Sequence, residues 1–140
     1  MGSINRVTLM GVIGSAPELK FSRNGKPFVR LSVATHKRIK DENGSSRRET
    51  QWHGIMLWGK NAEICSTYCE KGAPVYIEGH LAHYTKSENG MKTHQVVVMG
   101  DQVQFIPGTR MAMSSEAGEF EAPPLAPLSE PPQEEGVTLN

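Results

Sequence analysis

Five short segments of this chain alternate between apolar and polar residues, which restricts the fold to a small structure built mainly of β-strands. Successive side chains of a strand point to opposite faces, so a strand with one buried face shows this alternation. The predicted strands span residues 4–13, 26–35, 50–60, 74–84 and 93–104. A single helix is predicted at residues 61–70, where apolar side chains recur at helical spacing and Gly72 follows as a stop signal.

A long polar segment, residues 36–49, separates the second and third predicted strands. Asn43-Gly44 near its middle is a turn signal, so this segment is predicted to form a hairpin that extends beyond the rest of the sheet. Asn89-Gly90 marks a second turn. One helix between the third and fourth of five strands is the element order of an OB-fold, a small all-β barrel. An SH3-like barrel is the alternative, but the helix position favours the OB-fold.

The charge of the chain is distributed very unevenly. All 15 Lys and Arg and nine of the 15 Asp and Glu lie within residues 1–110, which gives this part a net charge of +6. Residues 111–140 contain six Glu and no basic residue, a net charge of −6. We therefore expect an OB-fold domain at residues 1–108 and a disordered, Pro/Glu-rich acidic tail at residues 109–140. A basic body indicates a polyanion ligand for which the tail competes, although such a tail can also be a solubilising extension.

Several classes of protein do not fit the sequence. No apolar run approaches the roughly 20 residues that span a bilayer, and no signal-peptide pattern is present, so a cytoplasmic protein without a membrane partner is expected. Cys65 and Cys69 have no further ligands near them, which favours buried thiols over a metal site. His80 and His83 are predicted to face opposite sides of a strand, which also argues against metal binding. No catalytic set appears, so neither enzyme activity nor a cofactor is expected.

Both tryptophans of the chain lie in the third predicted strand. Trp52 and Trp58 share one face with Gly54 between them, which predicts open space between two aromatic surfaces, and Lys60 continues that face. The opposite face, with Ile55 among its residues, is the predicted core face. Aromatic rings beside a cation are suited to holding unpaired nucleotides. The alternative is that the tryptophans serve only for packing or for a protein interface.

Nine short motifs follow one another in order and give the chain a specific resemblance. They are Asn5-Arg6-Val7, Gly11-Val12-Ile13-Gly14, Pro17-Glu18-Leu19, Ala34-Thr35, Thr50-Gln51-Trp52-His53, Trp58-Gly59-Lys60, Ala62-Glu63-Ile64, Lys71-Gly72 and Val75-Tyr76-Ile77-Glu78-Gly79-His80-Leu81. Through residues 3–106 the chain resembles the bacterial single-stranded-DNA-binding protein family. The resemblance implies an OB-fold assembled as a homotetramer. It also implies binding of single-stranded DNA without sequence preference in replication, recombination and repair.

The resemblance also assigns roles to particular residues. Trp52 and Trp58 are expected to stack on bases, with Tyr84 as a substitute platform. His53 and Tyr76 are expected near subunit contacts. The residues expected at the DNA backbone, including the cations of the predicted hairpin, are Arg6, Lys37, Arg38, Lys40, Arg47, Arg48, Lys60, Lys71 and Lys86.

The sequence departs from the family pattern at several of these positions. Ile39 and Lys86 stand where the family has tryptophans, and Gly54 stands where it usually has an arginine. Each stacked base is worth about 1–3 kcal/mol, so these losses predict a weaker binder that depends more on phosphate contacts.

The family tail ends in an aromatic tip that docks into replication and repair proteins. Here the last residues, 134–140, have two aliphatic side chains and no aromatic one, so recruitment of such partners is expected to be weak. A tail that only modulates DNA binding by charge competition is the alternative. For the whole chain, the alternatives are an oligomeric OB-fold interaction module, as in primosome-type or accessory plasmid and phage paralogues, or an RNA-binding OB protein.

Overall fold

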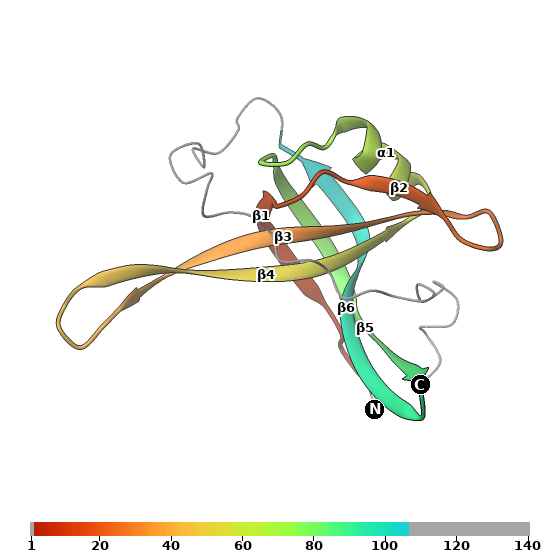
Figure 1. The fold of residues 1–140 in the computed structure, drawn as a ribbon. Helices are drawn as coiled ribbons and strands as arrows, with labels where there is room; N and C mark the ends of the chain where they lie inside the picture. Colours follow the sequence, from red (N-terminus) through yellow and green to blue (C-terminus); the bar gives the residue numbers. More distant parts are fainter. Residues whose placement is uncertain (1, 107–140) are drawn as a thin grey trace.

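The computed structural model describes residues 2–106, which form six strands and one helix (Figure 1). The elements are β1 (Val7–Ile13), β2 (Glu18–Phe21), β3 (Pro27–Lys40), β4 (Ser46–Trp58), α1 (Lys60–Tyr68), β5 (Pro74–Glu88) and β6 (Met91–Phe105). The predicted acidic tail, residues 109–140, lies outside the described residues.

Five of the six strands close into a barrel. The strand order is β1-β5-β6-β4-β3-β2, and β1 also pairs with β3 through Val12 with Ala34 and Ile13 with Val33. All pairings are antiparallel except that of β4 with β6. α1 follows the third barrel strand and precedes the fourth, so the predicted OB-fold is confirmed. The four-residue β2, which is too short to show alternation, was not predicted; it pairs only with β3, at the rim of the barrel.

Both predicted hairpins form, and their strands are longer than the sequence pattern indicates. β3 and β4 pair as far as Lys40 with Ser46, so the hairpin with Asn43-Gly44 at its turn projects from the barrel (Figure 1). Residues 36–40 and 46–49 extend these strands without a buried face, which is why alternation did not reveal them. At the other hairpin Asn89 and Gly90 have φ of 53° and 78°, as the two central residues of a type I′ turn require.

The prediction that Gly72 terminates the helix was wrong. α1 ends at Tyr68, and the next residue, Cys69, is already extended, with its N–H still bonded to the carbonyl of Cys65. Gly72 instead occupies the turn that leads into β5. Its φ is 90° and its N–H donates to the Ile13 carbonyl, which ties this turn to β1.

The barrel interior and the inner side of α1 form one apolar core. Its fully buried members include Ile13, Leu31, Leu57 and Ile77. Cys65 and Cys69 are 0% and 8% exposed in this core, which confirms that they are buried thiols.

Candidate nucleic-acid interface

The strand register fixes which side chains of β3 and β4 point away from the barrel interior. Residues paired directly across antiparallel strands share a face. Val29, Leu31 and Ile55 belong to the core, so the residues between them point outward. The outward pairs are Phe28 with Trp58, Arg30 with Met56, Ser32 with Gly54, and Ala34 with Trp52. We call this surface the outer face; it includes both tryptophans, as the alternation predicted.

Trp58 is largely packed on the outer face. Only 5% of it is exposed, and its ring lies 5.2 Å from that of Phe28 at a tilt of 41°. The ammonium of Lys26 stands 5.5 Å from the centre of the Trp58 ring, a cation–π contact. The cluster around them consists of Met56, Ala82, Val97 and Met99, with Tyr84 packed against it. The space beside Trp58 that the sequence predicted to be open is therefore largely filled.

One aromatic side chain on the outer face and one beside it, on β5, are more accessible than Trp58. Trp52 and Tyr84 are each partly buried. The Tyr84 hydroxyl donates to Oε1 of Gln95, which orients the phenol ring on the β5–β6 hairpin. Small residues, Ser32 and Gly54, form the pair that separates Trp52 from the cluster around Trp58.

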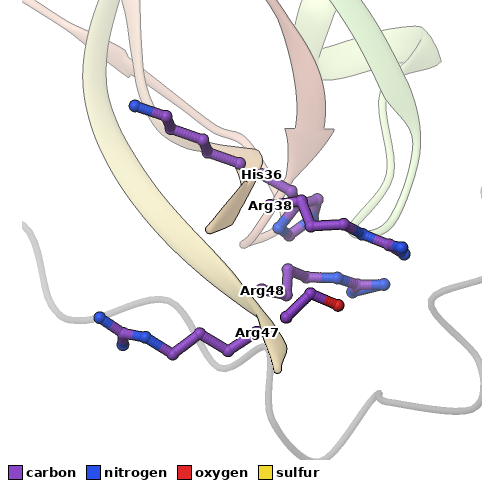
Figure 2. A pocket seen from close by; sticks show the side chains of 6 residues that line it. His36, Arg38, Arg47 and Arg48 are labelled. Carbon is purple, nitrogen blue, oxygen red and sulfur yellow. The ribbon is translucent and has the colours of Figure 1, made fainter. Parts of the chain in front are cut away.

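The β3–β4 hairpin carries a dense group of basic side chains beyond the barrel. An open pocket of about 280 Å³ at this hairpin is lined by His36, Lys37, Arg38, Ser46, Arg47 and Arg48. Arg38 and Arg48 project to one side of the hairpin and Arg47 to the other (Figure 2). The register puts Arg38 and Arg48 on the same side as Trp52, so a basic strip continues the outer face along the hairpin.

The remaining predicted backbone contacts are less concentrated. Arg6, Lys60 and Lys71 are exposed, but they lie before β1, at the start of α1 and in the turn before β5. Lys86 is only 18% exposed in its side chain and pairs with Glu88 at 3.4 Å. The register therefore places Arg38, Lys40 and Arg48 in line with the outer face and Lys37 and Arg47 on the other side of the hairpin, and the other four predicted cations lie apart from the hairpin.

The two predicted interface residues lie in different settings. His53 lies at the barrel end of the β3–β4 hairpin, with its Nε2 2.8 Å from Oγ1 of Thr35, and burial lowers the pKa of its imidazole. The Tyr76 hydroxyl donates to Oε1 of Glu78, which raises the pKa of the phenol. Tyr76 pairs across the strands with Met10, which is 63% exposed.

Two cations of this region were missed from the sequence. Lys26 covers Trp58, and Arg30 is the outward residue between Val29 and Leu31. Alternation along residues 26–35 puts Arg30 on the face opposite to Val29 and Leu31, but it does not tell which of the two faces is buried. The predicted hairpin at residues 36–49 already puts the two strands side by side, but the register between them, which pairs Arg30 with Met56, has no local sequence signal.

Membrane-spanning helices and metal clusters are both absent from the part of the chain that the structure describes. Within residues 2–106, no helix has the length and apolar character needed to cross a membrane. Over the same range, no group of three or more His, Cys, Asp or Glu side chains is arranged to hold a metal ion.

Comparison with known proteins identifies the family. The model of the single-strand binding protein family matches residues 4–106, which is most of the chain. The chain belongs to this family. Among curated single-strand binding relatives, it is 42% identical over 105 residues to the single-stranded DNA-binding protein 1 of Chlorobaculum tepidum. It is 34% identical over 107 residues to the single-stranded DNA-binding protein of Xanthomonas axonopodis pv. citri. These matches cover 74% and 75% of this chain but only 65% and 59% of the relatives.

Solved structures of single-strand binding proteins share the fold. A deletion mutant of the single-stranded DNA binding protein from Thermus aquaticus superposes with a TM-score of 0.67 at 27% identity, covering 75% of this chain and 51% of that one. The Plasmodium falciparum protein, solved in complex with single-stranded DNA, has a TM-score of 0.68 at 23% identity, covering 76% of this chain and 97% of that one. The second likeness supports the fold alone.

Proposed function

We propose that this chain binds single-stranded DNA without sequence preference and protects it during replication, recombination and repair, in the cytoplasm or nucleoid. One observation carries the proposal: the outer face with Trp52 continues into the basic strip of Arg38 and Arg48. Aromatic rings accept any base, and cations bind the phosphates that every strand presents. The binding needs no catalytic group and no cofactor.

The geometry favours different roles for the predicted residues: base stacking, support of the outer face, and phosphate binding. Trp52 and Tyr84, which are partly exposed, stack on bases; Trp58 mainly supports the face beneath them. The hairpin cations Lys37, Arg38, Lys40, Arg47 and Arg48 bind phosphates. Because stacking surface is limited, electrostatics supplies a large share of the affinity, and each phosphate contact adds about 0.7 to the salt slope.

We further infer that the chain forms a homo-oligomer, with a tetramer as the expected size. Within the described residues, β1 pairs with β3 only through Val12 and Ile13, so its earlier residues have an open edge opposite β5. An open strand edge is a surface on which a second strand can pair. Met10 lies on this edge strand and its cross-strand partner Tyr76 on β5, and the two supply apolar and polar contact area beside the edge.

A fluorescence titration tests the DNA assignment. Tryptophan emission is recorded while oligo-dT is added at several salt concentrations, and the same titration is repeated with oligo-U and with duplex DNA of equal length. We expect quenching by oligo-dT, with an affinity that falls steeply with salt and exceeds that for duplex DNA. No binding of oligo-dT at low salt would contradict the proposal.

A second candidate is an oligomeric interaction module with weak nucleic-acid binding. The burial of Trp58 and the open β1 edge favour it, because both suit protein contacts. The Trp52→Ala variant separates the two functions. Loss of oligo-dT binding by an intact oligomer supports DNA binding, whereas dissociation of the oligomer supports the interaction module.

A further inference from the structure

Gly54 leaves a gap in the charge of the outer face. The family resemblance places an arginine here, between the two tryptophans, and this chain has no side chain at that position. A phosphate of bound DNA that an arginine at this position would contact needs a different cation of this chain. The neighbouring strand is therefore the place to look for a replacement.

Arg30 on β3 is the outward-facing cation nearest in register to Gly54. Gly54 pairs with Ser32, and Arg30 is two residues from Ser32 on the same face. Diagonal neighbours across two strands lie about 7–8 Å apart, a distance that a long side chain spans. Ser32 and Gly54, the pair next to Arg30 and Met56, are both small residues.

The outward side of β3 at Arg30 adjoins the β5–β6 hairpin, because Met56, the cross-strand partner of Arg30, packs with Ala82, Val97 and Met99. The Arg30 guanidinium interacts electrostatically with the Tyr84 phenol, and its charge opposes the rise in the Tyr84 pKa that burial causes. β3–β4 and β5–β6 run across one another in Figure 1, and outward side chains of both hairpins pack together in the cluster around Trp58. Partial burial lowers the pKa of Arg30, yet an arginine remains charged at neutral pH.

We propose that Arg30 replaces the arginine missing at Gly54 and binds a phosphodiester of the DNA strand whose base rests near Trp52 and Tyr84. The cation is supplied from β3 instead of β4. An arginine fork is suited to two oxygens of one phosphate, and its planar group stacks on aromatic rings. The inference rests on the proposed DNA binding and assigns one position within it.

The proposal is tested by removing the positive charge at Arg30 and by moving it to position 54. Arg30→Met removes the charge and keeps an unbranched apolar side chain, Arg30→Lys keeps the charge, and Arg30→Met combined with Gly54→Arg moves the charge to β4. Arg23→Met is the matched control, because Arg23 lies exposed in the turn between β2 and β3. Oligo-dT affinity is measured against salt for each variant, and thermal unfolding checks that each is folded.

We expect Arg30→Met to weaken binding about tenfold at low salt and to reduce the salt slope by about 0.7, the value of one phosphate contact. Arg30→Lys should keep the slope, the combined variant should restore it, and Arg23→Met should change both quantities much less. A slope that is unchanged by Arg30→Met in a folded protein would overturn the proposal.

A second readout separates a phosphate contact from a purely structural role. Tyrosine ring-carbon NMR follows the ionisation of Tyr84 with and without oligo-dT. A stacked base should raise the Tyr84 pKa in both proteins, and a phosphate that neutralises Arg30 should raise it further, so the rise should be larger in the wild-type protein than in Arg30→Met. Equal responses of the two proteins would contradict the assignment. If wild-type protein bound no oligo-dT, the proposed function would fail as well; a failure confined to Arg30 would leave wild-type binding intact.

Discussion

At the scale of single residues, the two tryptophans are expected to have different roles although they lie on the same face. Trp58 is only 5% exposed, packed against Phe28 and beneath Lys26, whereas Trp52 is partly exposed. Trp58→Ala should therefore destabilise the fold by about 3–5 kcal/mol, as expected for a large buried aromatic. Trp52→Ala should cost about 1 kcal/mol of stability or less and weaken DNA binding by about 1–3 kcal/mol.

Denaturant unfolding and oligo-dT titration of both variants check this division. Equal stability losses in the two variants would contradict it, as would unimpaired binding by a folded Trp52→Ala protein.

His53 gives the stability of the protein a predictable pH dependence. Burial lowers the pKa of its imidazole below the ordinary value of 6.5, so the unfolded chain takes up this proton at a higher pH than the folded one. The stabilisation from neutral His53 is fully present above about pH 6.5 and is lost as the pH falls through the lower folded pKa. His53→Gln should lose less stability between about pH 7.5 and pH 5 than the wild type.

Thermal unfolding of the two proteins across this pH range measures the difference. Parallel pH profiles would mean that the pKa of His53 is the same in the folded and the unfolded protein, against the lowering expected from burial.

The sequence predicted the direction of these side chains but not their surroundings. Alternation placed Trp52 and Trp58 outward and Ile55 inward, and the register confirms it. Burial of Trp58 depends on Phe28 and Lys26, which lie on another strand and the turn before it. A period-two pattern contains no information about such neighbours across strands.

At the scale of elements, the β3–β4 hairpin can be removed without disturbing the core. Residues 41–48 are exposed, and neither apolar cluster includes a residue of the segment 36–50. Joining Thr35 to Gln51 through Asn-Gly, where the two strands already pair, should leave stability within about 1 kcal/mol. DNA binding should weaken, and the salt slope should fall by about 0.7 for each phosphate that the hairpin cations neutralise in the wild type.

The measurement is the salt dependence of oligo-dT binding for the truncated protein beside the wild type. A truncated protein with an unchanged salt slope would show that the hairpin cations do not contact the strand.

Elements that bury one apolar face could be predicted from the sequence, whereas features held in place by long-range backbone hydrogen bonds could not. The five barrel strands and the helix were found because each buries one face in a common core. β2 is held by its four residue pairs with β3. Gly72 does not end the helix, which stops at Tyr68; its N–H instead bonds to the Ile13 carbonyl in the turn before β5. Long-range hydrogen bonds of this kind have no local sequence signal.

At the scale of the whole molecule, a basic body is combined with an open strand edge. The net charge of +6 on residues 1–110 favours a polyanion, and the open edge of β1 suits pairing between copies of the chain. Shared edges would place several outer faces on one assembly, so that a single strand could contact more than one subunit. Such sharing would offset the few stacking residues in each subunit.

The most direct test of DNA binding by such an assembly is mass measurement of the full chain during titration with oligo-dT in solution at low salt. We expect an oligomer, with a tetramer as the expected size, that binds oligo-dT as an intact assembly and binds duplex DNA of equal length more weakly. A monomer, or an oligomer that prefers duplex DNA or binds neither nucleic acid, would contradict this expectation.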